Sequence, residues 1–73
     1  MNQWFDVKEL KDEGYYWHAV EPRDPEPLLC KVEWFINDGN VALGVIFIGE
    51  NTHRLVSKVG GWFCQVTYPH SFV

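Results

Sequence analysis

The chain has 73 residues and a net charge of −4, and 47% of its residues are hydrophobic and 16% aromatic. This length predicts a single domain over residues 1–73, and the apolar content excludes an intrinsically disordered chain. Nine acidic and four basic residues lie in residues 1–38, against one acidic and two basic residues in 39–73, so the sequence offers no dense basic face for nucleic acid or for an anionic membrane surface.

The N-terminal segment predicts a short α-helix over residues 6–13. Asp6 and Glu9 have the spacing of a capping box, and Phe5 and Leu10 have the spacing of a hydrophobic staple across the same cap. A glycine follows directly and would end the helix in a left-handed turn. Because two helical turns are marginal in isolation, we expect this helix to dock on the rest of the domain through its apolar side chains.

Residues 14–20 are dense in aromatic and β-branched side chains and predict a first strand. Alternation along this strand places Tyr16 on one face of the sheet and Tyr15 and Trp17 on the other. Residues 21–27 contain three prolines and predict an extended acidic loop, because proline lacks a backbone donor and fixes φ. The loop is open to two interpretations, a stiff solvated connector or a negative surface for a basic partner.

The strongest local prediction is a β-hairpin formed by residues 28–36 and 41–48. The Asp-Gly dipeptide at its centre has the chemistry of a type I′ turn, in which both central residues need positive φ. Pairing Asn37 with Asn40 sets apolar residues opposite each other on one face. Because a slip by one residue would expose half of this face, the turn and the apolar pattern specify one register. The expected pairs are Ile36 with Val41, Trp34 with Leu43, Val32 with Val45 and Cys30 with Phe47.

The opposite face of this hairpin is also rich in apolar residues. It carries Leu29 and Phe35 beside two charged residues of the first strand, and only apolar residues and glycine in the second. We expect either that the N-terminal helix covers this face or that the face is a contact surface.

Residues 52–59 and 62–68 predict two more strands, separated by a Gly-Gly turn. The whole pattern therefore predicts a mainly β fold: a small five-stranded antiparallel barrel or bent sheet (SH3-like) with one short N-terminal α-helix. So thin a barrel leaves little room for a pocket of several hundred cubic ångströms.

Cys30 and Cys64 are the only cysteines, which is too few for the disulfide framework of a small secreted protein. The N-terminal segment has acidic residues where a signal peptide has its apolar core, and no apolar stretch is long enough to span a membrane. We therefore expect a cytoplasmic protein with two buried thiols, which would form a disulfide between strands only if they met. No histidine has a second ligand at a zinc-binding spacing, so we expect no metal and no other cofactor.

The sequence predicts no catalytic residues. Nucleophilic catalysis needs a nucleophile, a base and an oxyanion donor in a cleft, and neither serine lies in an elbow motif. Cys64 with His53 or His70 is the least unfavourable dyad. Because Cys64 lies in an apolar strand, an inert buried thiol is the better interpretation.

The aromatic side chains are more informative. The chain carries four Trp and three Tyr, more than so thin a core can bury. Trp and Tyr are common anchors of protein interfaces because they supply a large contact area for little lost rotamer freedom. Exposed aromatic residues can equally do no more than shield a small core. We predict partner binding through the apolar anchors Tyr16, Trp17 and Phe35, with a charged rim of Glu21, Asp24 and Glu26.

Four short motifs stand between residues 14 and 69: Gly14-Tyr15-Tyr16-Trp17, Pro25-Glu26-Pro27 before a strand, Phe47-Ile48-Gly49, and a closing Trp62-Phe63 with Tyr68-Pro69. Together they resemble short uncharacterised proteins of phages and prophages. The chain departs from those proteins in its capped N-terminal helix and its unusually apolar second hairpin strand. The resemblance implies a host bacterial cytoplasm and no catalytic residues. It also implies a class of small acidic proteins that bind and block host proteins.

We therefore predict a non-enzymatic protein-binding module of phage or prophage type that occupies a surface of a host protein or complex. One specific form is an inhibitor of a host defence complex such as CRISPR. The first alternative is a self-associating structural protein that buries its apolar sheet face in a homodimer, and the second is a minimal enzyme. We expect no direct binding to nucleic acid or to a membrane.

Overall fold

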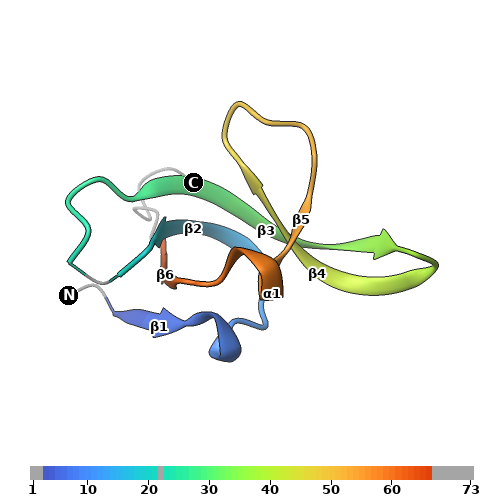
Figure 1. Ribbon diagram of the computed structural model, residues 1–73, viewed down its shortest axis with the longest axis horizontal. Coiled ribbons are helices and arrows are strands. Elements are labelled where there is room, and N and C mark those ends of the chain that lie inside the picture. The colour runs from blue at the N-terminus through green and yellow to red at the C-terminus, as the bar shows by residue number, and fades with distance from the viewer. Residues whose placement is uncertain (1–2, 22, 67–73) are drawn as a thin grey trace, which may run out of the picture.

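The computed structural model describes residues 3–21 and 23–66. In these residues, six strands form one antiparallel sheet in the order β1-β6-β2-β3-β4-β5 (Figure 1). None of the helices in the described ranges is long and apolar enough to cross a membrane. The elements along the chain are β1 Trp4–Asp6, the 3-10 turn η1 Val7–Glu9, β2 Gly14–Ala19, β3 Leu28–Asn37, β4 Asn40–Phe47, β5 Arg54–Leu55, the short helix α1 Val56–Val59 and β6 Trp62–Gln65.

β3 and β4 form the predicted hairpin in the predicted register. Asn37 pairs with Asn40, and the four predicted apolar pairs follow. Asp38 and Gly39 have φ values of 52° and 81°, as the central residues of a type I′ turn require. The observed pairs confirm the predicted register. The turn chemistry and the apolar alternation specify the same pairing independently.

The predicted helix over residues 6–13 is wrong. The chain enters the sheet as β1, which pairs with β6 and sets Phe5 opposite Phe63, and then makes only the η1 turn. Asp6 still acts as a cap, because its Oδ1 accepts a hydrogen bond of 3.0 Å from the Lys8 backbone N–H. β1 overlaps the predicted helix only at Asp6, and after Asp6 the chain makes one 3-10 turn instead of two α-helical turns. Two helical turns are marginal by themselves, so the capping signal alone does not form the predicted helix.

The predicted strand over residues 52–59 is mostly wrong as well. Only Arg54 and Leu55 extend the sheet, as β5, before the chain turns into α1. The β-branched residues of this segment favour a strand by propensity. One helical turn instead places Val56 and Val59, three positions apart, on the core.

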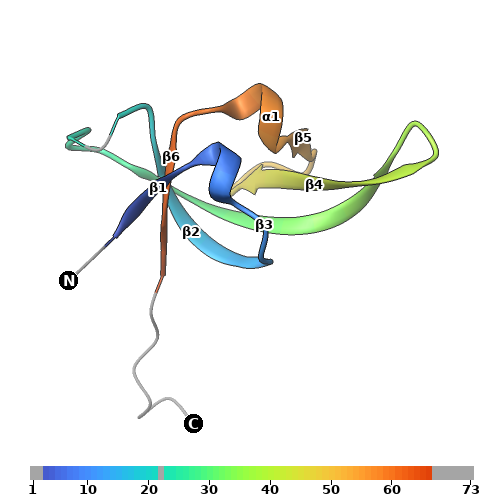
Figure 2. The same cartoon turned by 90° about the horizontal axis from the view of Figure 1, so that it is seen from below.

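One small core lies on the face of the sheet that η1 and α1 cover (Figure 2). Tyr16 is 2% exposed, and its ring meets the rings of Phe5 and Phe63 edge-on, with centroid separations of 6.0 and 6.1 Å. The Tyr16 hydroxyl donates a hydrogen bond of 2.9 Å to the Asp12 carbonyl oxygen. The buried members of this core are Leu10, Tyr16, Cys30, Val32, Leu43, Val45 and Phe63.

The fold is therefore mainly β, as predicted, with one antiparallel sheet and one short helix. The sheet is not closed, since β1 and β5 are its two edges. It has six strands instead of five because Trp4–Asp6, at the start of the predicted N-terminal helix, form β1, and the α-helix found among the described residues is α1. The barrel and the SH3-like arrangement are not confirmed by this open sheet. The end of the predicted strand 62–68, at residues 67–68, lies outside the described residues.

Candidate protein-binding surface

The β3–β4 hairpin extends beyond the rest of the sheet (Figures 1 and 2), and its end carries exposed apolar side chains. Trp34 is 51% exposed, Ile36 is 68% exposed and Val41 is 66% exposed. These three residues, called here the hairpin-end surface, lie on the face that supplies Val32 and Val45 to the core nearer the base of the hairpin. The apolar face is continuous, but the core covers only part of it.

This exposure follows from unequal strand lengths. β3 has 10 residues and β2 has 6, and their pairing stops where Gly14 meets Val32. On the other side of the hairpin, β5 pairs with β4 only at Gly44 and Val45. Beyond these points the hairpin has no neighbouring strand in the described part of the chain.

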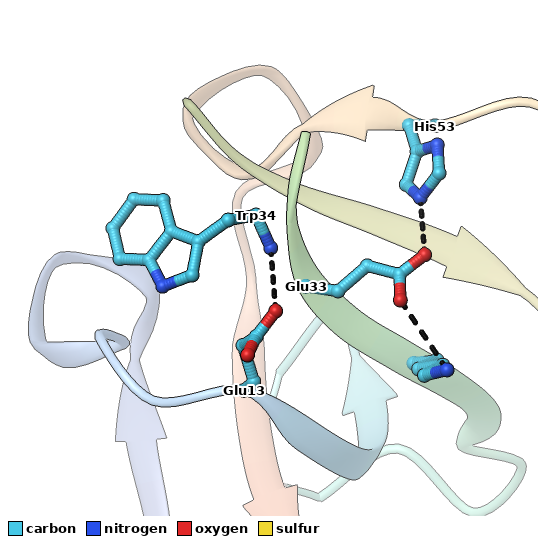
Figure 3. A network of polar contacts seen from close by, with 5 residues as sticks. Glu13, Glu33, Trp34 and His53 are labelled. Atoms are coloured by element: carbon cyan, nitrogen blue, oxygen red, sulfur yellow. Dashed lines mark hydrogen bonds and ion pairs between the residues drawn. The ribbon is translucent and has the colours of Figure 1, made fainter. Parts of the chain in front are cut away.

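The free edge of β3 is partly capped by a side chain. In this register the backbone groups of Trp34 and Ile36 point away from β4, toward the side that β2 occupies nearer the base. Glu13 accepts, through Oε2, a hydrogen bond of 2.9 Å from the Trp34 backbone N–H (Figure 3). A charged side chain at a strand edge opposes unwanted pairing with another strand. The next residue whose backbone groups point out from this edge is Ile36.

The opposite face of the hairpin end is covered by His53, which corrects the first of the two expected alternatives, that an N-terminal helix covers it. Phe35 lies directly over Gly44, where an added Cβ would be 2.5 Å from the Phe35 Cε1 atom. The His53 ring stacks on Phe35 with a centroid separation of 4.8 Å and an interplanar angle of 13°. The Nε2 of His53 donates a hydrogen bond of 2.6 Å to the Glu33 Oε2 atom (Figure 3). The N-terminal segment packs on the core face instead, through Leu10.

Glu33 is the centre of a small charged cluster on this face. Its second oxygen, Oε1, lies 3.3 Å from the Lys31 Nζ atom. The hydrogen bond from His53, followed by that from Lys31, holds the pKa of Glu33 below its ordinary value. Glu33 is therefore ionised at neutral pH. The hairpin end has one face that carries this charged cluster and is covered by His53, and an opposite apolar face that is exposed.

Two open cavities adjoin each other near the base of the hairpin and share His18, Phe47 and Arg54 in their walls. One has a volume of about 520 Å³ and lies among the hairpin, β5 and α1. The other has a volume of about 480 Å³ and lies beside Asp24 and Glu26, in the loop predicted over residues 21–27, called here the proline loop. The expectation that so small a fold leaves little room for a pocket is wrong. A closed barrel would fill its interior with side chains, whereas this sheet is open.

Tyr16 is not a surface anchor, contrary to the prediction. It pairs with Cys30, which sets both side chains on the core face, and its 2% exposure leaves no surface for a partner. The sequence alternation separated Tyr16 correctly from Tyr15 and Trp17, but it did not say which set faces the core. Tyr15 and Trp17 are the outward set, at 37% and 38% exposure.

Trp17 and Phe35 lie on the same outer face, but the structure does not bring them together. Trp17 pairs with Leu29, and Phe35 lies six positions further along β3, about 20 Å away at the usual rise per residue. Trp17 is exposed, whereas Phe35 is half-buried beneath His53. These two residues therefore do not form one anchor cluster.

The three predicted rim acids lie in one turn of the proline loop. The Asp24 backbone N–H donates a hydrogen bond of 3.0 Å to the Glu21 carbonyl oxygen, and Asp24 Oδ1 accepts one of 2.9 Å from the Glu26 backbone N–H. Part of the role of Asp24 is thus to hold the loop. Asp24 and Glu26 also line the cavity of about 480 Å³, beside the exposed apolar residues Val20, Leu28 and Ile48. An acidic rim exists here, but around different apolar residues from those predicted.

The hairpin-end surface was missed because its residues were assigned to the core. The pattern correctly placed Trp34, Ile36 and Val41 on the core side of the hairpin. The available signal was the length of the apolar alternation in residues 28–36, which is longer than the neighbouring predicted strand 14–20. Side chains at the end of a strand are not shielded by the sheet where no neighbouring strand lies beside them.

The structure favours no catalytic or metal chemistry at the cysteines. Cys30 and Cys64 are buried free thiols, as predicted. They pair with the neighbouring residues Tyr16 and Trp17 of β2 and so face opposite sides of the sheet. Burial raises the pKa of the Cys30 thiol to about 12. Within residues 3–21 and 23–66, no three metal-ligating side chains come together, and His70 of the weighed dyad lies outside these ranges.

No family model matches the chain, and no curated protein or solved structure proved similar to it. The fold and its surfaces are therefore the basis for a functional assignment. They define a small, mainly β protein with an exposed apolar surface at the end of a long hairpin.

Proposed function

We propose that this chain is a non-enzymatic protein-binding module whose contact surface is the hairpin-end surface. The observation that carries this proposal is the exposure of Trp34, Ile36 and Val41 on a face that is otherwise the core face. Soluble monomers rarely leave contiguous apolar side chains uncovered without a binding role. These side chains do not shield the core, since they extend past it.

The geometry suits recognition in two further ways. The three side chains stand on paired strands, so little conformational entropy is lost when a partner binds. Trp34 is the natural anchor, because Trp is enriched among the few interface residues that carry most of the binding free energy. The stack of Phe35 and His53 on the other face supports the hairpin from behind.

Charge indicates the character of the partner. Glu13 lies at the Trp34 backbone and Asp38 lies in the hairpin turn, so an apolar patch bordered by basic residues would complement this surface. The rim acids Glu21, Asp24 and Glu26 would add a second, steering contact. The resemblance to phage proteins supports a host protein or defence complex as the partner, in a bacterial cytoplasm, and an SH3-like scaffold would suit the same role.

The test compares the wild-type chain with a Trp34→Ser/Ile36→Ser variant as bait in a bacterial lysate, followed by affinity measurements with the purified partner. We expect the variant to lose affinity by about 30-fold or more, as truncation of a central Trp does. Val20→Ser is the matched control, because Val20 is 78% exposed but lies away from the hairpin. Circular dichroism should show both variants folded, since substitutions at exposed positions change stability little.

Equal binding by the wild type and the Trp34→Ser/Ile36→Ser variant would contradict the proposal. Loss of binding with Val20→Ser alone would move the contact surface to the cavity beside the proline loop.

Self-association is a second candidate function, and the open edge of β3 favours it. Two copies could pair antiparallel at Ile36 and bury both hairpin-end surfaces about a two-fold axis. Three side chains alone fall short of the roughly 800 Å² per partner of a stable interface, so edge pairing would have to supply the rest. Size-exclusion chromatography with light scattering decides the matter: a dimer at low micromolar concentration that Trp34→Ser abolishes supports self-association.

A further inference from the structure

The cavity of about 520 Å³ collects basic side chains in a protein whose net charge is −4. Residues 39–73 contain only two basic residues, Arg54 and Lys58, and both line this cavity. His18 and His53 line it too, whereas no Asp or Glu does among the described residues. Glu50 pairs with Arg54, and Glu33 pairs with His53, so the charge of this lining that is not paired with a described acid is that of Lys58.

Arg54 is held in place at this cavity. Its guanidinium carbon lies 5.7 Å from the centroid of the Phe47 ring, and its Nη2 lies 2.9 Å from the Glu50 Oε2 atom. A guanidinium has five N–H donors in a rigid fork, so one bond to Glu50 leaves others for a ligand. Lys58 makes no ion pair with any described residue, and it stands on α1 at the wall of the same cavity.

The two imidazoles are also oriented by the fold. The Nε2 of His18 donates a hydrogen bond of 3.0 Å to the Gly60 carbonyl oxygen, and the Nε2 of His53 donates to Glu33. The remaining wall is mostly apolar and is formed by Phe35, Phe47, Leu55 and Val59. The cavity thus joins the held guanidinium of Arg54 and the ammonium of Lys58 to a mostly apolar wall, and a few polar groups on an apolar wall are the usual composition of a small-molecule site.

The adjoining cavity has the opposite charge. Asp24, Glu26 and Glu50 line it, against Arg54 as its only Lys or Arg among the described residues. The two cavities have similar volumes, and apolar side chains line both. They differ in the charge of their lining. A ligand that reads charge would therefore discriminate between them.

We infer that the basic cavity binds a small organic anion, a phosphate or carboxylate group carried on a flat apolar body. Arg54 and Lys58 contact the anionic group, and the apolar wall takes the body. This inference is independent of the protein-binding role proposed above, because none of the three residues of the hairpin-end surface lines the cavity.

The test is an NMR titration of the full-length, ¹⁵N-labelled chain with four probes of similar shape: phenyl phosphate, benzoate, benzyl alcohol and benzylamine. We expect phenyl phosphate, benzoate or both to give saturable shifts of the backbone amides of residues 53–59 and of Phe35. Benzyl alcohol should bind more weakly, and benzylamine should not shift these amides. The comparison of phenyl phosphate with benzoate tells which anionic group the site prefers.

The charge contribution is tested with Arg54→Gln/Lys58→Gln, which should lower the affinity for the preferred anion by roughly five-fold or more, since each exposed charge pair contributes a factor of a few. Lys8→Gln removes a charge away from this cavity and should leave the affinity unchanged. Lys58→Gln alone, at an exposed position, keeps the test valid if the double variant unfolds. Equal binding of benzyl alcohol, or equal affinity in Lys58→Gln and the wild type, would overturn the inference.

Discussion

The stack of Phe35, Gly44 and His53 shows how one missing side chain organises a face of the hairpin. Phe35 lies diagonally across from Gly44 on the neighbouring strand, and the absence of a Cβ lets the ring lie flat on the backbone. His53 then stacks on the ring and bonds to Glu33. Phe35 therefore stabilises the hairpin from the polar face, in a role that its predicted use as an exposed anchor did not anticipate.

Gly44→Ala should lower the free energy of unfolding by about 1–3 kcal/mol, the usual cost of overpacking. The new Cβ would meet the Phe35 ring at 2.5 Å, so the ring must move and lose its stack on His53. Chemical denaturation measures the effect. In a Phe35→Leu background the same substitution should cost clearly less, because the obstructing ring is gone. Equal costs in both backgrounds would show that the ring is not the cause.

At the scale of elements, the β3–β4 hairpin is both the best-determined part of the fold and its most exposed part. Its length exceeds that of β2, so its end has a free edge and an uncovered apolar face. Such edges promote association between sheets unless something blocks them. Glu13 blocks this one at the Trp34 backbone N–H.

Glu13→Ala should therefore increase concentration-dependent self-association, because it frees that N–H and removes a charge from the edge. Light scattering over a concentration series measures the effect. Glu13→Gln should lie between Ala and the wild type, since the amide oxygen still accepts a hydrogen bond. Glu9→Ala is the control for charge alone. Association that rises equally in Glu9→Ala and Glu13→Ala would assign the effect to net charge instead of the edge.

At the scale of the whole molecule, stability depends on one thin core. Domains of this size retain only about 3–5 kcal/mol from core burial. Tyr16 and Cys30 lie side by side in that core, where the Cys30 Sγ atom donates to the Tyr16 carbonyl oxygen at 3.4 Å. Burial is the first cause that raises the pKa of each group, and for Tyr16 the nearby Asp12 adds to it.

The chain should consequently lose stability in alkaline solution. The pKa of Cys30 rises from 9.0 to about 12 on folding, so the unfolded state loses its proton first as the pH increases. The contribution of this thiol is complete below pH 9 and is lost as the pH rises through 12. Urea unfolding at several pH values measures the loss, which should be shallower in Cys30→Ala. Parallel pH profiles for the wild type and Cys30→Ala would contradict this account.

The sequence by itself determined the features that depend on adjacent residues and on the two-residue alternation of side chains along a strand. The Asp38-Gly39 turn and the alternation of apolar residues specify the hairpin register independently, and the register is found as predicted. The separation of Tyr16 from Trp17 and the place of Cys30 on the core face follow from the same alternation. These features hold because a turn type and a period of two are local properties of the backbone.

Only the tertiary structure decided which surfaces are covered. Residues 6–13 begin with a helix cap, yet Trp4–Asp6 pair with β6 as β1 and only the η1 turn follows. Residues 52–59 favour a strand, yet one helical turn, α1, packs Val56 and Val59 against the core. The hairpin-end surface stays exposed because β2 and β5 stop short of it. Burial depends on the lengths and positions of neighbouring elements, and no single segment of the sequence contains that information.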